Sequence, residues 1–323
     1  MHSTDVEDKV SLVTRNAMEV VTEEELRKLL ETKERPRAYV GYEPSGEIHL
    51  GHIMTVNKLI DLQRVGFDVV VLLADVHAYL NEKGDFEDIK QIADYNKRAF
   101  IALGLSENKT EFVLGSSYQL EKDYVLDVHQ FARITTLNRA KRSMDEVSRR
   151  TKDPMVSQMV YPLMQALDIA HLKVDLAIGG MDQRKIHMLA RENLPRLGYS
   201  SPICLHTPIL QGLDGEKMSS SKGNYVSVEE TEEQIAKKIK KAYCPLEVEG
   251  NPIIQIMQYH IFPRFDKVVV ERDEKFGGDM EFDSLEELKS KYASGELHPA
   301  DLKTAAANYL NKLLRKPKDV LYT

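Results

Sequence analysis

The sequence predicts an α/β fold: a doubly wound, Rossmann-like parallel sheet with a helical insertion, followed by a mostly helical C-terminal domain. Two observations lead to this class. A strand, a helix and a second strand follow one another within about 40 residues, which is the pattern of a βαβ unit. Further strand-like runs then alternate with helical stretches, and the pattern becomes helical after Asn224.

The elements of the sheet domain follow from caps and from hydrophobic spacing. Thr22 and Glu25 have the spacing of a capping box that opens a short helix. The continuous apolar run at 67–74 is typical of a parallel strand buried on both faces. The sequence then predicts, in order, strand 37–41, helix 49–65, strand 67–74, strand 111–114, a mostly helical stretch 122–172, strand 174–178 and strand 203–210.

The C-terminal part has helix signals only. Thr231 with Gln234 and Ser284 with Glu287 have capping-box spacing, and residues 299–314 are rich in alanine and leucine. We therefore expect three parts, which are an N-terminal helical segment at 1–35, the Rossmann-like catalytic domain at 36–226 with its insertion at about 116–172, and a helical domain at 227–323.

The composition is that of an ordinary globular protein. The 323 residues include 44 Lys and Arg against 51 Asp and Glu, a net charge of −7, and 42% are hydrophobic. Cys204 and Cys244 are far apart and outside any CxxC, so neither a disulfide framework nor a zinc knuckle is supported, and a reducing cytoplasm fits. The apolar run 69–74 is too short to span a bilayer, and the acidic, polar start differs from a signal peptide.

Net acidity does not exclude a nucleic-acid partner, because local charge decides phosphate contacts. Seven basic residues lie in one short stretch, with only two acidic ones among them: Arg133, Arg139, Lys141, Arg142, Arg149, Arg150 and Lys152.

The loop after the first predicted strand carries two histidines. Residues 41–52 read GYEPSGEIHLGH, so His49 and His52 enter the first turn of a helix three positions apart. Free N–H groups at a helix start favour an anion, and imidazoles at this spacing share a face. Gly51 between them leaves room for a ribose or phosphate on the backbone. A pair of surface histidines is the alternative, and a metal site lacks a third ligand nearby.

A second segment, 215–224, reads GEKMSSSKGN, in which hydroxyl side chains separate Lys217 from Lys222 and glycines flank them. Ammonium groups neutralise phosphate oxygens as point charges, so the segment suits a loop over a polyphosphate. By itself it could equally be a solvated linker. The sequence has neither GxxxxGKS/T nor GxGxxG and so lacks the signatures of P-loop NTPases and dinucleotide oxidoreductases.

HLGH at 49–52 and KMSSS at 217–221 together resemble the paired signatures of class I aminoacyl-tRNA synthetases, in the same order along the chain. The fourth position of the more widespread KMSKS pattern is Ser220 here. The resemblance implies ATP as substrate, with Mg²⁺ bound to it and no metal site of the protein itself. It implies catalytic roles for His49, His52, Lys217 and Lys222. It implies ATP contacts at Gly41, Gly51, Gly180, Asp182, Met218, Ser219 and Ser220.

A polar stripe on an apolar helix indicates a pocket. Gln158, Tyr161, Gln165 and Asp168 recur at spacings of three, four and three, which places them on one helical face. The other positions are almost all apolar, so the stripe is too narrow for a water-facing side. We interpret it as a pocket lining; a buried hydrogen-bond network is the alternative.

With Tyr39, ADVHAYLNEKG at 74–84 and GGMDQRKIHMLAREN at 179–193, this stripe is similar to the tyrosine pocket of archaeal and eukaryotic tyrosyl-tRNA synthetases. The resemblance runs from about Arg37 to Lys303. It implies that Tyr39 and Asp168 contact the phenol hydroxyl and that His77 lines the pocket. It implies further that Tyr161, Gln165 and Gln183 hold the ammonium group and Asp182 the adenosine ribose.

The same resemblance implies that the helical domain reads the anticodon of tRNA(Tyr), with Phe276 stacking on a base and His298 and Asp301 beside it. It implies acceptor-stem contacts at Arg142, Arg184 and Lys185, and a homodimer with its interface in the inserted helices. From the residues alone, Phe276 could equally be a core residue and Asp301 a partner of the helix dipole.

The function expected from these features is ATP-dependent ligation of tyrosine to tRNA in the cytoplasm, without a membrane partner. Three alternatives stay open: a tryptophan–tRNA ligase, a tRNA-binding paralogue without catalysis, and a small nucleotidyltransferase that shares only HxGH. The intact histidines argue against the second, and the C-terminal domain with KMSSS argues against the third.

Overall fold

The structure is a computed structural model that describes residues 3–147, 153–218 and 222–321. The chain divides into two compact units, one of residues 1–46 and 58–208 and the other of residues 47–57 and 209–323. In the described part of the chain, no helix combines the length and the apolar character that a membrane span requires.

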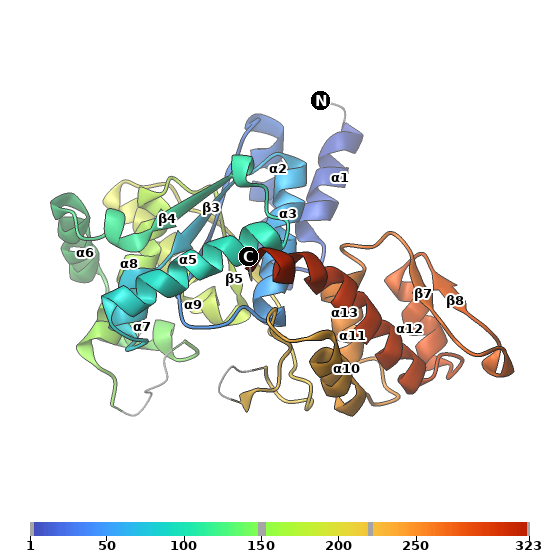
Figure 1. The fold of residues 1–323 in the computed structure, drawn as a ribbon. Helices are drawn as coiled ribbons and strands as arrows, with labels where there is room; N and C mark the ends of the chain where they lie inside the picture. Colours follow the sequence, from blue (N-terminus) through green and yellow to red (C-terminus); the bar gives the residue numbers. More distant parts are fainter. Residues whose placement is uncertain (1–2, 148–152, 219–221, 322–323) are drawn as a thin grey trace. The chain divides into compact units, whose positions relative to one another are not determined.

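The first unit is built on a sheet in which the described strands have the order β1-β6-β5-β2-β3-β4 (Figure 1). The strands are β1 (Glu19–Val21), β2 (Arg37–Tyr42), β3 (Asp68–Leu73), β4 (Thr110–Leu114), β5 (Leu176–Gly180) and β6 (Ile203–Thr207). Neighbouring strands are parallel, except that β1 is antiparallel to β6. The direction of winding reverses between β2 and β5, and the carboxyl ends at such a switch point form the usual ligand crevice.

Helices cover both faces of this sheet (Figure 1). The helices up to β6 are α1 (Ser3–Thr14), α2 (Glu23–Thr32), α3 (Leu50–Val65), α4 (Asp75–Leu80), α5 (Phe86–Ala102), α6 (Lys122–Ile134), α7 (Leu137–Met144), α8 (Val156–His171) and α9 (Arg184–Asn193). Short 3₁₀ turns are η1 (Glu107–Lys109), η2 (Gly115–Ser117), η3 (Met181–Gln183) and η4 (Leu194–Leu197). The first residues of α3, up to Asn57, belong to the second unit.

The core of the first unit lies where β2 and β3 meet α8. β3 is buried over all but its first residue, and Tyr39, Val70 and Leu72 share one apolar cluster with Leu163 and Leu167. A strand buried on both faces needs apolar side chains at every position. The predicted run at 67–74 therefore formed the expected central strand.

The predicted fold class is confirmed, and several boundaries are corrected. The strand predicted at 174–178 begins two residues later, and the one predicted at 203–210 ends at Thr207. The N-terminal segment is not purely helical, because β1 lies between α1 and α2 and joins the edge of the sheet. A strand of three residues carries too short an alternation to be recognised in the sequence.

The second unit is mostly helical, as expected, but it also contains a two-stranded antiparallel sheet that we did not predict. Its elements are α10 (Glu232–Lys241), α11 (Pro252–Ile256), the π-helix η6 (Met257–Ile261), β7 (Val268–Val270), η7 (Glu274–Phe276), β8 (Met280–Phe282), α12 (Leu285–Ala293) and α13 (Pro299–Leu321). The capping box at Thr231 is present. Ser284 caps α12, but the Glu287 carboxylate accepts from the Asp283 N–H instead of closing the box.

The C-terminus of α1 is held by a buried lysine of α3. The Lys58 ammonium donates to the carbonyls of Leu12 (3.3 Å), Val13 (2.8 Å) and Arg15. These carbonyls lack partners within α1, as the last carbonyls of any helix do. Burial removes water from the ammonium and lowers the pKa of Lys58 to about 8. The three carbonyl contacts replace the hydrogen bonds to water that are lost.

We expect Lys58→Met to lower the free energy of unfolding by about 1–3 kcal/mol, because the helix-end carbonyls lose their donor while the apolar stem is kept. Denaturant unfolding of the purified chain measures this. Lys9→Met is the matched control, since Lys9 pairs with Asp5 in an exposed contact, which is worth about 0–1 kcal/mol. Equal losses in the two variants would show that the carbonyl contacts add no stability.

Candidate active site

Tyr39 is the third residue of β2, the strand that borders the switch point, and it is buried. A Cβ atom at Gly41 would lie 2.7 Å from the Tyr39 hydroxyl, so only glycine at this position lets the phenol keep its place. Burial, reinforced by the negative charge of Asp168, raises the pKa of Tyr39 well above its ordinary value. The hydroxyl therefore keeps its proton at neutral pH.

Three donors converge on one oxygen of Asp168, which is completely buried in α8. Asp168 Oδ1 accepts from the Tyr118 hydroxyl (2.7 Å), from Gln119 Nε2 (2.8 Å) and from the Tyr124 hydroxyl (2.8 Å). Among the described residues Asp168 Oδ2 has no hydrogen-bond partner, and His77 Nε2 lies 3.7 Å from it. A buried carboxylate oxygen without a partner is costly, which marks this position as one that a ligand completes.

The two tyrosines that hold Asp168 stay protonated. Burial and then the nearby Asp168 charge raise the pKa of Tyr118 and of Tyr124 far above 10. Each hydroxyl can therefore act as a donor to the carboxylate. The cluster leaves an acceptor, Asp168 Oδ2, and a donor, the Tyr39 hydroxyl. Together they suit a ligand hydroxyl that both gives and receives a hydrogen bond.

A second polar group in the same unit surrounds Glu43. The Tyr161 hydroxyl donates to Glu43 Oε1 (2.6 Å), and Asn81 Nδ2 lies 3.1 Å from the same oxygen. The ring of Tyr161 meets that of His77 edge to face at 4.6 Å between centroids. Lys83 Nζ lies 3.6 Å from Glu43 Oε2. This carboxylate gives the region a negative charge that suits a ligand cation.

The segment after β5 passes close to its own side chains. A Cβ at Gly179 would lie 2.7 Å from Gln183 Cβ, and one at Gly180 would lie 2.5 Å from Asp182 Oδ1. Gln183 Oε1 accepts from Gln165 Nε2 at 3.0 Å, which links the segment to α8. Both glycines are therefore needed for the position of the acidic and amide side chains.

A buried chain of side chains supports this segment from behind. Glu19 Oε1 lies 2.8 Å from His206 Nδ1, and His206 Nε2 lies 3.0 Å from His187 Nδ1. Arg184 also donates to Glu19. Burial alone would raise the pKa of Glu19, but Arg184 and His206 bring it below its ordinary value. The ring of His187 in turn lies 3.0 Å from the position of a Cβ at Gly179, so this chain of side chains lies directly behind the segment.

In the second unit, the predicted histidine pair opens α3. His49 Nδ1 accepts from the Gly51 N–H (3.1 Å), and His52 Nδ1 accepts from the His49 N–H (3.2 Å). Since a neutral imidazole has one N–H, each ring carries its proton on Nε2. A Cβ at Gly51 would lie 3.0 Å from His49 Cε1. Glycine at this position therefore keeps the first ring in place.

Burial keeps both rings neutral. It lowers the pKa of His49 to about 4 and, together with the neighbouring His49, lowers the pKa of His52 well below 6.5. The ring centroids lie 4.2 Å apart, and Tyr225 lies 4.8 Å from His49. The pair therefore carries two neutral N–H groups, which keep their protons at physiological pH.

The lysine-rich segment forms a turn held by its backbone. Met218 N–H donates to Leu210 (3.0 Å), and Asn224 Nδ2 donates to the Lys217 carbonyl (3.2 Å). The Lys217 side chain is exposed. Lys222 Nζ lies 3.6 Å from Glu216 Oε2. The predicted contact residues Ser219 and Ser220 lie outside the described residues.

The residues expected at the anticodon gather in the second unit. Phe276 is 62% exposed on η7, so its interpretation as a core residue is wrong. Arg272 Nη1 donates to the Glu296 carbonyl (3.0 Å), which ties the turn of Phe276 to the loop that precedes α13. His298 Nδ1 accepts from the Ala300 N–H (3.1 Å), and Asp301 lies in the first turn of α13.

The residues expected at the acceptor stem differ in their contacts. Arg142 is exposed at the end of α7. Lys185 pairs with Glu146 (3.0 Å) and Asp145 (3.6 Å), and these carboxylates raise its pKa. Arg184 is committed to Glu19. Arg149, Arg150 and Lys152 of the basic stretch lie outside the described residues.

Four polar residues of the first unit were missed in the sequence: Glu43, Tyr118, Gln119 and Tyr124. Tyr118 and Gln119 follow a short 3₁₀ turn and Tyr124 lies in α6, so no single periodicity joins them. The one available signal was the stripe on α8, whose buried Asp168 had to have donors from other elements.

Comparison with known proteins places these features in a family. Residues 31–315 match the model of tRNA synthetases class I (W and Y). The chain is 73% identical to a tyrosine–tRNA ligase of Archaeoglobus fulgidus over 96% of both chains. It is 62% identical to that of Methanopyrus kandleri over 96% of this chain and 97% of the other. A crystal structure of tyrosyl-tRNA synthetase complexed with L-tyrosine from A. fulgidus superposes with a TM-score of 0.97 at 72% identity, covering 98% and 99% of the chains.

We expect the His49 ring to titrate near pH 4, because burial disfavours its charged form. The unfolded chain, with an ordinary pKa of about 6.5, binds more protons between these values. The contribution of His49 to stability therefore rises with pH through this window and is complete above about 6.5. NMR of ¹⁵N-histidine, assigned with His49→Gln, measures both the midpoint and the Nε2–H tautomer. A midpoint near 6.5 would contradict the buried geometry.

Proposed function

The chain belongs to the class I tRNA synthetases of the tryptophan and tyrosine family, and we propose that it is a tyrosine–tRNA ligase. It joins tyrosine to AMP at the expense of ATP and then transfers the tyrosyl group to the 3′ end of tRNA(Tyr). The observation that carries the choice of amino acid is the buried Asp168 Oδ2, which has no hydrogen-bond partner among the described residues and belongs to the carboxylate whose charge acts on the Tyr39 hydroxyl.

This pair of groups favours tyrosine over the other aromatic amino acids. A phenol hydroxyl donates to Asp168 Oδ2 and accepts from Tyr39, so both buried groups are satisfied. The indole of tryptophan has only a donor and would leave the Tyr39 hydroxyl without an acceptor. Phenylalanine would leave both groups unpaired, which costs the full desolvation of a buried donor and acceptor.

The other end of tyrosine is held by the remaining polar side chains of the first unit. Tyr161, Gln165 and Gln183 offer oxygen atoms to the substrate ammonium group, and Gln165 Oε1 has no hydrogen-bond partner among the described residues. Glu43, which holds the Tyr161 hydroxyl, adds a nearby negative charge. We assign Asp182 to the adenosine ribose, since Gly180 keeps its carboxylate against the backbone.

In the first step, a carboxylate oxygen of tyrosine attacks the α-phosphorus of ATP. A C–O–P link forms, the bond between the α-phosphorus and the bridging oxygen breaks, and pyrophosphate leaves. In the second step, a terminal ribose hydroxyl of tRNA attacks the carbonyl and AMP leaves. The nucleophiles belong to the substrates, so the protein acts by positioning and by stabilising charge.

His49 and His52 supply neutral N–H donors for the phosphates, and Lys217 supplies a positive charge for the leaving pyrophosphate. ATP would bind as its Mg²⁺ complex, in which the metal would neutralise part of the negative charge of the phosphates. The described residues contain no cluster of three potential metal ligands. We assign the Mg²⁺ to the substrate ATP, whose phosphates bind it.

We assign residues 227–323 to anticodon binding and residues 36–226 to catalysis. Exposed Phe276 offers a stacking surface, and the Arg272–Glu296 contact brings its turn to the loop that carries His298. We assign Arg142, Arg184 and Lys185 to the acceptor stem, where Arg184 and Lys185 would exchange their acidic partners for phosphate oxygens. The free cysteines fit a reducing cytoplasm as the place of action.

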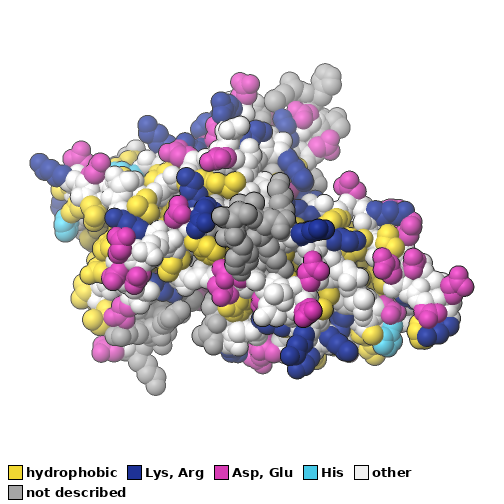
Figure 2. All heavy atoms as spheres, in the orientation of Figure 1, with side chains coloured by type: hydrophobic (Ala, Val, Ile, Leu, Met, Phe, Trp, Pro, Cys, Tyr) yellow, Lys and Arg dark blue, Asp and Glu magenta, His cyan; other side chains and the backbone are white. Residues whose placement is uncertain are grey.

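We further propose a homodimer whose interface uses the helices of the insertion. Hydrophobic side chains gather at the edge of the molecule where α6 and α7 lie (Figure 2). Leu120, Val125, Leu126 and Leu137 are 40–69% exposed there. Contiguous exposed apolar surface of this kind marks a protein interface, and a second copy would cover it symmetrically.

The amino-acid assignment is tested by pyrophosphate exchange into ATP with tyrosine, tryptophan and phenylalanine. We expect exchange with tyrosine only. Asp168→Asn removes a charge-assisted hydrogen bond to the phenol, so kcat/KM for tyrosine should fall about ten- to a hundredfold and selectivity over phenylalanine should fall with it. Tyr124→Phe, which removes one of three donors to Asp168, should give a smaller fall. If Asp168→Asn weakens both amino acids equally, Asp168 is structural and the phenol lies elsewhere.

The role of the histidines is tested separately. His49→Ala or His52→Ala should slow adenylate formation by about two to three orders of magnitude, the scale of one preorganised donor, with tyrosine binding almost unchanged. Because His49 donates from Nε2, His49→Gln, whose amide nitrogen reaches that position, should retain more activity than His49→Asn. Single-turnover kinetics measure this. Equal rates for Gln and Asn would show that the donor is not Nε2.

A further inference from the structure

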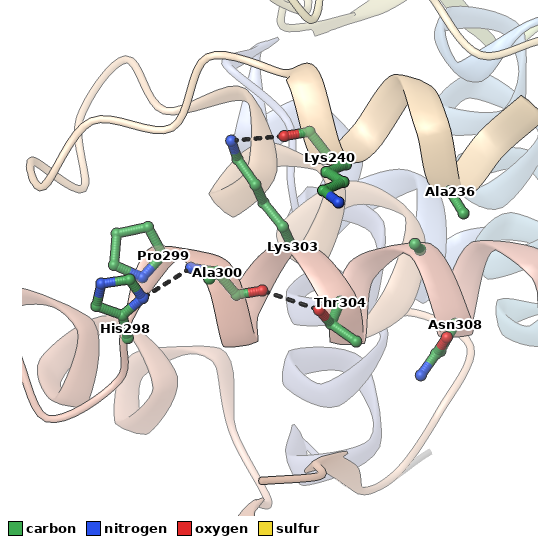
Figure 3. Close-up of a pocket in the computed structure, with 9 residues that line it drawn as sticks. Ala236, Lys240, His298, Pro299, Ala300, Lys303, Thr304 and Asn308 are labelled. Atoms are coloured by element: carbon green, nitrogen blue, oxygen red, sulfur yellow. Dashed lines mark hydrogen bonds between the residues drawn. The ribbon is translucent and has the colours of Figure 1, made fainter. Parts of the chain in front are cut away.

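A groove in the second unit runs between α10 and α13 and has a volume of about 600 Å³ (Figure 3). This volume is within the range of ligand pockets, about 300–1,000 Å³. Its floor consists of short side chains, Ala236 on α10 and Ala300, Thr304 and Ala307 on α13. On α13 these positions follow the i, i+4, i+7 spacing of one helical face, so the groove follows the helix axis.

The groove is positively charged, although acidic residues outnumber basic ones in the chain as a whole. Lys240, Lys303 and His298 line it, and none of the described residues that line it is a carboxylate. Lys303 Nζ donates to the Lys240 backbone carbonyl at 3.2 Å, which keeps its ammonium at the groove (Figure 3). The described residues offer neither lysine an ion pair, so both charges are available to an anion.

The groove is continuous with the residues that we assign to the anticodon. His298 lines its end, and the turn that carries Phe276 is tied by Arg272 to Glu296, two positions before His298. From His298 to Asn308 the helix rises about 15 Å, at about 1.5 Å per residue. A strand with one base stacked on Phe276 therefore has room to continue along α13.

We propose that this groove binds the phosphodiester backbone of the anticodon-loop strand next to the nucleotide stacked on Phe276. Lys240 and Lys303 contact phosphate oxygens, the alanine floor accepts the sugar and base, and the exposed Asn308 amide faces the edge of that base. The inference deepens the proposed function, on which it rests. It names the strand backbone as the ligand of a groove that the tyrosine and ATP sites do not use.

The test measures binding of an RNA hairpin with the anticodon stem and loop of tRNA(Tyr) to the full-length chain at several salt concentrations. We expect Lys240→Ala and Lys303→Ala each to weaken binding about three- to tenfold near 0.1 M salt. The double variant should lower the magnitude of the slope of log K against log salt by about 1.4, at about 0.7 for each phosphate contact on a single strand. Lys240→Arg and Lys303→Arg should bind nearly as the unmutated chain does.

Lys267→Ala is the matched control, because Lys267 is an exposed lysine of the same unit that pairs with Glu281. Phosphate contacts carry no sequence information. The lysine variants should therefore weaken a hairpin with a changed anticodon by the same factor, whereas Phe276→Ala should reduce the preference between the two hairpins. Unfolding midpoints of all variants, compared with that of Lys267→Ala, report whether the fold is kept.

Two outcomes would overturn the groove assignment: an unchanged salt slope in the double variant, or a loss that appears with AMP or pyrophosphate as the probe and not with the hairpin. The second would make the groove a site for a free nucleotide or phosphate. The proposed function fails on a different measurement, which is the absence of tyrosine-dependent pyrophosphate exchange by the unmutated chain. Normal exchange with an unchanged slope would therefore reject the groove alone.

Discussion

The arrangement of the first unit depends on providing hydrogen-bond donors to one carboxyl group inside the protein. Asp168 is completely buried, and an ion there must be paired or hydrogen-bonded. Tyr118, Gln119 and Tyr124 meet this demand at one oxygen from two other elements. The other oxygen is left for the substrate. Because the donors come from the loop after β4 and from α6, the inserted segment between β4 and β5 is as much a part of amino-acid selection as the sheet itself.

The sequence was sufficient for features that depend on near neighbours. The run at 67–74 forms a buried strand, the capping box at Thr22 begins α2, and HLGH lies at the start of α3. Each of these signals is contained in a few consecutive residues. It was insufficient where a role arises between distant segments. Glu43 reads as a polar loop residue until Tyr161, 118 positions away, donates to it. Capping signals and hydrophobic periodicity relate residues that are close in the sequence, so they cannot reveal such distant pairs.

The same distinction applies to basic residues. Arg184 and Lys185 are adjacent and both match expected RNA contacts, yet Arg184 is tied to Glu19 while Lys185 faces two acidic residues of the α7 end. A count of positive charges in the sequence cannot tell a residue that already has a partner from one that is available. In the second unit, Lys240 and Lys303 between α10 and α13 are of the available kind, since the described residues form no ion pair with them.

The antiparallel strand β1 has a consequence for how the chain is made. Glu19 pairs with His206, 187 positions later (206 − 19), so β1 leaves the ribosome long before the strand with which it pairs. Before β6 is made, β1 has no strand to pair with, and Glu19 cannot contact His206 behind Gly179. Synthesis and folding of this unit therefore cannot proceed together from the N-terminus. Long-range pairing of this kind slows folding, and a nascent chain halted before β6 would contain most of the pocket without the strand that completes the sheet.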